Sequence, residues 1–589
     1  MGATFTIGRY ETNRIRATRS AIRRPRLYLA ARFRLPRLCA LLAAAVALLA
    51  GSLLGNGGLV AQVPAPPLFP SPTVTQSAGL TNVGSIYFVD NDIGNDASNC
   101  LSPTLLPQPA SGQVTGPCKT IQHTIDLTRD RDLVVVASQG AILLQAAIQV
   151  PDLIGVIASG FFPTNCEDVV GGFPKVVLQS AYGGPVFHIT AAGGPTLHAL
   201  IAGFILGGAT DFVNPGALVL DHDEYSEIRC NIIGQEDLPN VIGIVTRSSE
   251  HPWIHDNTVH GSTQFPISVT LAPTPPIGGF GLVTDECLGG NGRTDQLQVE
   301  RNLFAFNSNA GLWVCSDGSG GHVIQQNNVR SNGRGIVLMS AVDTTIKQNA
   351  IGDNYFDGVD ILDASQNNLL EANQIESQEG PSSTGVLLQG SGALFPLGNS
   401  LSANEIRRNR VDVLISGARA TRFVGNSISA IGERTAILFA IGNTSGLGGA
   451  RFGQPTGTIL RTNKIYDDGE CTALRGCAIR LLPGVTASID ATSNDFGVTD
   501  AVDIQAAIWD HARDPELGSV LFSGPLGAPV LLSTSTVAAS RGTAPRLLPA
   551  NESSALAPIA STPQPGSLVA TSARPLRRRY PPALPVRPP

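Results

Sequence analysis

Apolar and polar positions along the middle of the chain follow one six-residue phrase: apolar, any, any, Asn, any, apolar. Such a phrase occurs nine times between Ile228 and Ile465. Successive asparagines lie 26, 45, 25, 22, 24, 31, 22 and 37 residues apart, so a unit of about 22–25 residues recurs with insertions. This period is typical of a solenoid, in which each unit buries its apolar face by stacking on its neighbours.

A second register follows most of the asparagines, in which a glycine precedes residues of period two, as in Gly311-Leu-Trp-Val and Gly335-Ile-Val-Leu. This alternation predicts short strands and leaves no segment long enough for a crossover helix. The strands of one unit can then pair only with those of the next, at about 4.8 Å per rung. We expect each Asn to adopt the unusual backbone angles of a turn and to bond the next Asn in a ladder.

The segment before the repeats contains further elements of regular structure. The apolar run 86–90 predicts a strand, and apolar residues four apart predict a short helix within 118–126. Strand-like runs follow at 133–137, 142–150 and 153–158. These elements precede the first rung and predict an entry segment for the coil.

Composition divides the chain into four parts. Residues 1–61 contain a basic stretch, an apolar run and small residues ending at Ala61, which predicts a signal peptide or an uncleaved signal anchor. Residues 62–84 form a Pro-rich linker, and 85–525 hold the repeats. Residues 526–589, rich in Pro, Ala, Ser and Arg, predict a disordered tail.

Charge is unevenly distributed and limits the partners. Residues 62–540 carry 23 basic and 44 acidic side chains, a net charge of −21. Such a body repels nucleic acid, so we expect no nucleic-acid partner. Membrane contact is expected only through the N-terminal segment, if it stays uncleaved.

Cysteine usage agrees with export. Eight cysteines follow the apolar N-terminal run, and an even count in an exported chain favours disulfides over metal ligation, because no C-x-x-C occurs. Pairing neighbours along the chain predicts four bridges, Cys100–Cys118, Cys166–Cys230, Cys287–Cys315 and Cys471–Cys477.

Three stretches resemble the right-handed parallel β-helix proteins, in particular secreted bacterial proteins of the NosD-like and pectate-lyase-like kind. The segment from Tyr87 to Asp126 resembles their entry cap, the nine phrases resemble their rungs, and the segment from Asn494 to Phe522 resembles their closing cap. At Asp495-Phe496 the closing cap departs from the usual Trp-Trp-Gly. The resemblance implies an all-β, right-handed parallel β-helix over 85–525. It implies no single function, because such proteins include lyases, hydrolases, epimerases and adhesins.

Alternation along the glycine strand identifies the side chains that face outward. This row contains Trp313, Asp360 and Asp412, and the next outward row contains Asp285. An aromatic face beside carboxylates is what sugar binding requires. We therefore predict ligand-binding roles for Trp313, Asp285, Asp360 and Arg334. The alternative is an outer face simply covered by loops.

Acid–base cleavage of a glycan needs two carboxylates facing one bond. Asp285, Asp360 and Asp412 are the catalytic candidates, and Asp360 and Asp412 lie two rungs apart, about 10 Å by the rung rise. No polygalacturonase or mannuronan-epimerase motif occurs. Insertions near 262–279, 288–296, 389–399, 442–454 and 466–476 predict loops that wall a groove.

Metal sites are weakly indicated. Asp90, Asp92 and Asp96 alternate along a turn and are calcium candidates, although the bidentate Glu of an EF-hand loop is missing. By analogy with NosD, His251, His255 and His260 suggest copper, but their spacing is irregular.

Two functions remain open. The first is an exported cell-surface or envelope protein that binds polysaccharide or envelope glycan without catalysis. The alternative is a polysaccharide lyase or glycoside hydrolase acting in a loop-walled groove around Trp313. The lack of a recognisable catalytic set favours the first.

Overall fold

The computed structural model describes residues 84–103, 115–151, 154–159, 166, 176–190, 199–211, 214–235, 237–262, 278–290, 292–316, 320–378, 380, 382–390, 394–430, 434–442, 454–466, 471–472 and 476–523. The signal segment 1–61, nearly all of the linker 62–84 and the tail 526–589 lie outside these residues, as does most of the predicted loop 262–279. Their boundaries stay predictions. None of the described helices is long and apolar enough to span a membrane.

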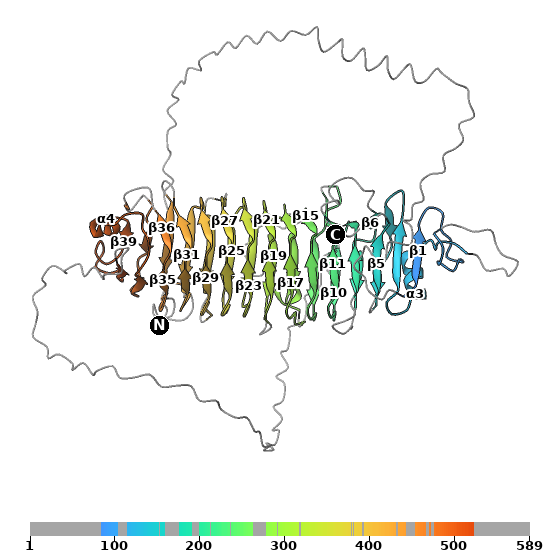
Figure 1. Ribbon diagram of the computed structural model, residues 1–589, viewed down its shortest axis with the longest axis horizontal. Coiled ribbons are helices and arrows are strands. Elements are labelled where there is room, and N and C mark those ends of the chain that lie inside the picture. The colour runs from blue at the N-terminus through green and yellow to red at the C-terminus, as the bar shows by residue number, and fades with distance from the viewer. Residues whose placement is uncertain are drawn as a thin grey trace, which may run out of the picture. The chain divides into compact units, whose positions relative to one another are not determined.

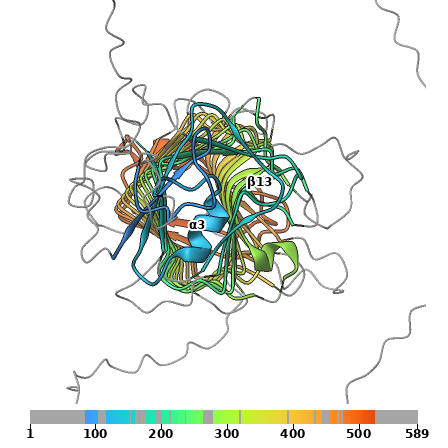
Figure 2. The ribbon, with the colours of Figure 1, turned by 90° about the vertical axis from the view of Figure 1, so that its right-hand side faces the viewer.

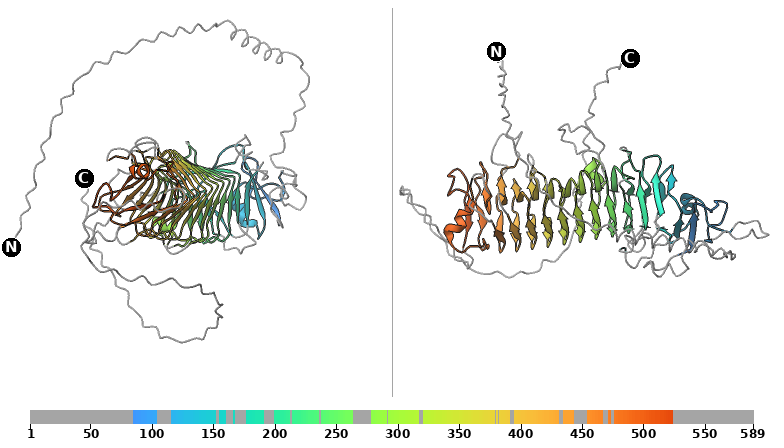
Figure 3. Two further views of the ribbon diagram at one scale, coloured as in Figure 1. Left: turned by 60° about the vertical axis from the view of Figure 1, so that its left-hand side comes forward. Right: turned by 90° about the horizontal axis from the view of Figure 1, so that it is seen from above.

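Three long parallel sheets wind around one apolar core and form a right-handed parallel β-helix, which confirms the predicted fold class (Figure 1). Each rung passes in turn through sheet 1, with 15 strands, sheet 2, with 12 strands, and sheet 3, with 13 strands. Seen from above, the strands of successive rungs lie side by side (Figure 3).

Sheet 1 contains β1(Ile86–Asp90), β2(Leu133–Ala137), β5(Gly155–Ala158), β8(Leu200–Ala202), β11(Glu227–Arg229), β14(Trp253–His255), β17(Gln298–Glu300), β20(Val323–Gln325), β23(Thr345–Lys347), β26(Leu369–Glu371), β29(Ser400–Ser402), β32(Arg422–Val424), β35(Ile459–Arg461), β38(Ile489–Ala491) and β40(Val520–Phe522). Sheet 2 contains β3(Ile142–Leu144), β6(Val176–Ser180), β9(Phe204–Gly207), β12(Ile232–Ile233), β15(Thr258–His260), β18(Leu303–Ala305), β21(Asn328–Arg330), β24(Ala350–Gly352), β27(Gln374–Glu376), β30(Glu405–Arg407), β33(Ser427–Ser429) and β36(Lys464–Tyr466). Sheet 3 contains β4(Ile148–Val150), β7(Phe187–Ile189), β10(Leu218–Asp221), β13(Ile242–Arg247), β16(Phe280–Thr284), β19(Ala310–Cys315), β22(Arg334–Met339), β25(Asp357–Leu362), β28(Thr384–Gln389), β31(Val411–Ser416), β34(Thr435–Ala440), β37(Ile479–Leu481) and β39(Ile508–Trp509).

Two short helices lie at the ends of the coil. Helix α3 (Ile121–Leu127) buries Ile121 and Ile125 and lies across the N-terminal end of the core (Figure 2). Helix α4 (Ala501–Ala506) buries Ile504 against the last rungs. Both termini of the apolar core are thus covered, as the resemblance to capped β-helices implied.

The apolar anchors of the repeated phrase stack one above another inside the coil. In sheet 1, Ile324, Ile346 and Leu370 are register partners on consecutive rungs, and each is fully buried. In sheet 2, Val329 and Ile351 are likewise register partners on consecutive rungs, and both are buried. Burying such side chains supplies the main favourable term of folding, about 25 cal/mol per Å² of apolar surface.

The asparagines of the phrase form the predicted ladder at the corner between sheets 1 and 2. Each side-chain oxygen accepts from the backbone N–H and the Nδ2 group of the preceding asparagine. The ladder has one member more than the phrase, because Asn494 accepts from Asn463. Its members are Asn231, Asn257, Asn302, Asn327, Asn349, Asn373, Asn404, Asn426, Asn463 and Asn494.

The expectation that these asparagines adopt unusual backbone angles is wrong. The left-handed residue is the one before each asparagine, for example Gln326 with φ 55° and Gln348 with φ 55°. That residue points outward and turns the chain. The Asn then follows with its amide aimed into the corner, so it is selected for hydrogen bonding and not for backbone freedom.

A second ladder, which the phrase does not reveal, lies at the corner between sheets 2 and 3. It runs through Asn307, Asn332, Asn354, Gln378 and Asn409 on consecutive rungs. The neighbouring glycines are required by this close packing. A β-carbon at Gly335, for instance, would lie 2.2 Å from the Gly358 carbonyl oxygen.

All four predicted disulfides are present, joining Cys100–Cys118, Cys166–Cys230, Cys287–Cys315 and Cys471–Cys477. Each closes a loop onto or beside the coil. Such cross-links stabilise chiefly by restricting the unfolded chain.

We predict that Asn349→Ala destabilises the coil strongly. Asn349 Nδ2 donates to the Ile324 carbonyl at 2.9 Å and to Asn373 Oδ1 at 3.0 Å, and its Oδ1 accepts from the Asn327 N–H at 2.9 Å. Each buried group left without a partner costs about 1–3 kcal/mol. Urea unfolding followed by circular dichroism measures the loss. The matched control is exposed Asn328→Ala, and equal destabilisation by the two changes would contradict the ladder's role.

Candidate functional site

The outward row of sheet 3 changes character along the coil. Register pairing places Trp313, Val337 and Asp360 on consecutive rungs, as predicted. The next members are Leu387, Leu414 and Leu438. The row is therefore apolar on both sides of a single carboxyl group, which singles out the rung of Asp360.

Asp412 is not in this row, and the predicted pairing of Asp360 with Asp412 is wrong. The registers of the flanking residues place Asp412 opposite Gly385, in the glycine column. Its Oδ1 accepts from the Asn409 N–H at 3.1 Å and from Asn409 Nδ2 at 3.0 Å, so it ends the second ladder inside the corner. Burial raises the pKa of this carboxyl group well above its usual value. The alternation failed here because Asp412 occupies the glycine's place.

Trp313 faces outward but is only 8% exposed. Its ring meets the edge of Phe280 at 5.3 Å between centroids. The short 3₁₀ helix η2 (Asp285–Leu288) belongs to the same apolar cluster and is fastened by Cys287–Cys315. The predicted open sugar platform at Trp313 is therefore not formed.

Asp285 also has a structural partner. Its Oδ1 lies 3.2 Å from Arg247 Nε on the preceding rung. This ion pair secures η2 at its first residue, in addition to the disulfide. Asp285 and Asp360 do not belong to one site.

The structure brings Arg334 and Asp360 together and adds Asp357. Arg334 Nε lies 3.1 Å from Asp360 Oδ2. Asp357 begins the strand that contains Asp360, and its Oδ1 accepts from the Thr384 N–H at 2.9 Å. Asp360 is 2% exposed, and its Oδ1 has no hydrogen-bond partner. Two carboxyl groups thus lie beside one guanidinium.

Both carboxyl groups hold protons more tightly than usual. Burial raises the pKa of Asp360 well above its usual value, and the charge of Asp357 raises it further, while Arg334 lowers it less. Burial likewise raises the pKa of Asp357, against the opposing charge of Arg334. Closely spaced carboxyl groups resist losing both protons, so at least one proton stays on the pair longer than on an exposed carboxylate.

An exposed aromatic pair adjoins these groups. Tyr355 is 53% exposed and Phe356 is 39% exposed, and their rings meet edge to face at 4.8 Å. The guanidinium of Arg334 lies 5.1 Å from the Phe356 ring centroid. We call this set the aromatic corner; its members are Arg334, Tyr355, Phe356, Asp357 and Asp360.

The sequence predicted Arg334 and Asp360 but missed the other three members. One signal could have found them. Four residues separate β24 from β25, and four also separate β18 from β19, where Phe306 is exposed, whereas three separate β21 from β22. The additional residue pushes Tyr355 and Phe356 out of the corner into solvent.

The carboxylates of the three calcium candidates accept hydrogen bonds from backbone N–H groups of different segments. Asp90 Oδ1 accepts from the N–H groups of Asp92 and Ile93 at 3.0 and 3.1 Å. Asp92 Oδ2 accepts from the Gln139 N–H at 2.7 Å, and Asp96 Oδ1 from the Lys119 N–H at 2.8 Å. Each carboxylate therefore caps a different stretch of chain, which explains the Asp-rich turn without an ion.

The three histidines suggested for copper have different surroundings and different partners. His251 stacks on Tyr225 at 4.5 Å between ring centroids. His255 lies in sheet 1 with both ring nitrogens bonded to carboxylates, and His260 lies in sheet 2, where burial lowers its pKa. The one group with metal-ligand spacing in the described part of the chain is Cys100, Cys118 and His123, whose two sulfurs form a disulfide.

A pocket of about 470 Å³ lies among the first rungs. Asp126, Arg129 and Asp130 line it together with Ile125 and Ile154. None of the aromatic-corner residues contributes to it. The pocket is therefore separate from the candidate site.

The fold and its disulfides define the chain as a right-handed parallel β-helix repeat protein. Its central rungs, residues 292–433, match the model of the family described as periplasmic copper-binding protein (NosD). The match spans less than half of the chain. No curated protein matches the sequence.

Solved structures with a similar course include several β-helix proteins. The A-module of the Azotobacter vinelandii mannuronan C-5 epimerase AlgE6 is 14% identical, with 69% of this chain and 93% of that one covered and a TM-score of 0.42. A DFA-IIIase from Arthrobacter chlorophenolicus A6 is 11% identical, with 74% of this chain and 99% of that one covered and a TM-score of 0.39. The Dettilon tailspike protein is 12% identical with a TM-score of 0.40, and the match covers 68% of this chain and 64% of the tailspike.

We predict that Asp360→Asn stabilises the protein increasingly as the pH rises. The pKa of Asp360 is raised in the folded state, so the wild type loses stability as the pH rises above the usual aspartate value toward the raised one. The amide does not titrate, and the gain grows by up to about 1.4 kcal/mol per pH unit. Thermal unfolding between about pH 4 and about pH 8 measures it. The control is exposed Asp353→Asn; parallel profiles for Asp360→Asn and wild type would contradict the prediction.

Proposed function

We propose that the protein is an exported, cell-surface or envelope β-helix protein that binds a glycan at the aromatic corner without cleaving it. The N-terminal signal-like segment and the four disulfides support export, because such bridges persist in oxidising compartments. A rigid coil of stacked rungs is suited to holding a binding surface in a fixed geometry.

The exposed pair of rings beside a cation is the observation that carries this proposal. Tyr355 and Phe356 present apolar faces to solvent, and sugar rings stack on such faces. Arg334 keeps part of its guanidinium accessible, since its side chain is 34% exposed. It can therefore donate hydrogen bonds to ligand hydroxyl groups while Asp360 fixes its position.

Burial of the carboxyl groups favours binding over cleavage. A glycosidase needs two carboxyl groups that reach opposite sides of the scissile bond. Asp360 is 2% exposed, and Asp412 is fully buried in the second ladder. The alternative of a lyase or hydrolase around Trp313 loses its platform, because η2 packs against that ring.

We expect Tyr355→Ala/Phe356→Ala to weaken glycan binding about tenfold, equivalent to about 1.4 kcal/mol, because the stacking surface is lost. A panel of immobilised polysaccharides, with and without calcium, first identifies a ligand. Titration of that ligand then compares the variants.

The matched control is Phe306→Ala. Phe306 is 63% exposed at the equivalent corner two rungs earlier, so its loss removes similar surface outside the proposed site. Equal weakening by the two changes would place binding elsewhere. New reducing ends or unsaturated uronate absorbance would contradict binding without cleavage.

A further inference from the structure

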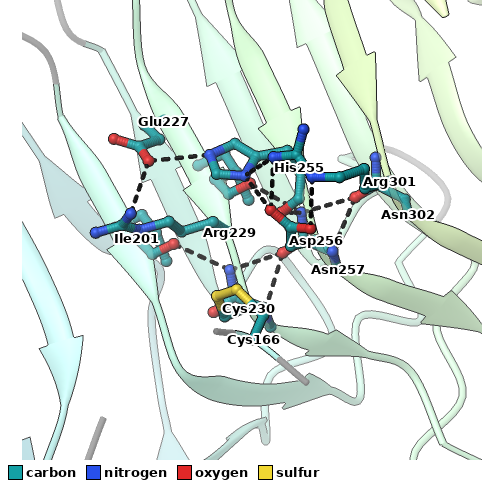
Figure 4. The surroundings of a disulfide bond; sticks show 12 residues. Cys166, Ile201, Glu227, Arg229, Cys230, His255, Asp256, Asn257, Arg301 and Asn302 are labelled. Carbon is teal, nitrogen blue, oxygen red and sulfur yellow. Dashed lines mark hydrogen bonds and ion pairs between the residues drawn. A yellow bond between two sulfur atoms is a disulfide. The ribbon is translucent and has the colours of Figure 1, made fainter. Parts of the chain in front are cut away.

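A chain of six charged side chains crosses the outer face of sheet 1, apart from the aromatic corner. His255 lies at its centre, with Nε2 2.9 Å from Glu227 Oε1 and Nδ1 2.6 Å from Asp256 Oδ2 (Figure 4). Arg229 Nη1 lies 3.3 Å from the same Glu227 oxygen. Arg301 Nη2 lies 2.8 Å from Asp256 Oδ2.

The hydrogen-bond pattern favours a positively charged imidazole. An ionised carboxylate only accepts hydrogen bonds, and a neutral imidazole has one N–H. Both ring nitrogens of His255 face carboxylate oxygens at hydrogen-bond distance. The two carboxylate contacts are satisfied together only when both nitrogens carry protons. Arg301 Nη2, which lies 3.3 Å from Nδ1, opposes that proton, and its charge is directed mainly at Asp256 at 2.8 Å.

The neighbouring charges are balanced only with this proton. Positive and negative groups alternate along the chain, and Arg301 Nη1 also pairs with Glu300 at 2.8 Å. Among these six side chains, a positive His255 makes three cations and three anions. The Trp253 ring, stacked on His255 at 4.0 Å, also favours the cation. The order along the chain is Arg229, Glu227, His255, Asp256, Arg301 and Glu300.

The cluster joins three successive rungs at a boundary of the outer face. Its members come from β11, β14 and β17 and from the corners after β14 and β17. On the N-terminal side, the outer face of sheet 1 is an apolar cluster that ends at Cys230 and includes Cys166. The Cys166–Cys230 disulfide lies beside the charged chain (Figure 4).

We propose that His255 is a proton-operated clamp, which holds rungs β11, β14 and β17 together when protonated and loosens this part of sheet 1 when it loses its proton. The clamp makes the region beside the Cys166–Cys230 bridge the part of the outer face of sheet 1 that opens as the pH rises. This inference does not depend on the proposed glycan site.

The direction of titration agrees with the geometry. Burial lowers the pKa of His255, but its hydrogen bonds to Asp256 and Glu227 outweigh this and raise the pKa above its usual value. A raised folded-state pKa means that the stabilisation is complete below the ordinary histidine value and is lost as the pH rises through the raised one.

The titration of buried His322 affects stability at low pH, whereas that of His255 affects it at high pH. Burial lowers its pKa to about 4, so its effect appears as the pH falls. Alkaline loosening at sheet 1 cannot therefore be assigned to His322.

Hydrogen–deuterium exchange of the full chain from about pH 5 to about pH 9 tests the clamp. Rates in peptides from β11, β14 and β17 are divided by those from β29, which lies in the same sheet away from both the His255 cluster and the Asp357–Asp360 pair and corrects for the intrinsic pH dependence. We expect the ratio to rise by up to about tenfold per pH unit once His255 titrates, because one proton is released. A constant ratio would overturn the clamp.

His255→Gln is expected to exchange rapidly in these rungs at every pH. The control His260→Gln, in sheet 2, keeps the wild-type profile. An unchanged pH profile in His255→Gln would overturn the proposal. If that variant does not fold, Asp256→Asn replaces it and should move the onset of opening to lower pH, because one stabilising anion is lost. An unmoved onset would overturn the clamp equally.

Discussion

The structure depends on satisfying backbone hydrogen bonds at corners that are buried. Between sheets 1 and 2 a left-handed residue turns the chain, and the next residue must supply the corner's missing donors and acceptors. Asparagine does so because its side chain carries an amide in the same geometry as the backbone. Asn349, for example, bonds the rung before it, its own rung and the rung after it. Without this column the apolar stacks could not be brought into register at constant spacing.

Because the interior is nearly uniform, differences in function arise on the outside. From Val283 to Leu438 the outward row of sheet 3 is apolar except at Asp360, and the corner just before that strand is one residue longer than the corner before β22. These two departures from the repeat coincide on one rung. Together they place a buried carboxyl pair beneath an arginine and an exposed aromatic pair, the one arrangement among the described rungs that combines these groups.

Buried ionisable groups make the stability of the coil fall both as the pH rises and as the pH falls. The raised pKa values of His255, Asp357 and Asp360 mean that their contributions fade as the pH rises. The lowered pKa values of His322 and Asp256 mean that theirs fade as the pH falls. The Asp357–Asp360 pair lies in sheet 3, apart from the contact between His255 and Asp256 at sheet 1, and in a repeat protein each rung interacts mainly with its neighbours. Local opening at different places is therefore the expected response to acid and to alkali.

The sequence by itself determined the fold, because each rung repeats the same local rule: apolar anchors inward, Asn at the corner and glycine where the backbone is crowded. Pairing neighbouring cysteines along the chain also gave the four disulfides that the structure contains, although Cys166 and Cys230 lie two rungs apart. The sequence did not determine the site. Trp313 and Asp360 were correctly placed in one outward row, yet Trp313 is buried in an apolar cluster that also includes Cys287 and Leu288 of η2. Asp412 was misassigned because it occupies the place of the glycine by which the other strands are aligned. Arg334 meets Asp360 and Phe356, and the His255 cluster forms, only through contacts across rungs. Outward neighbours are set by register between strands about 22–25 residues apart, which no local pattern specifies.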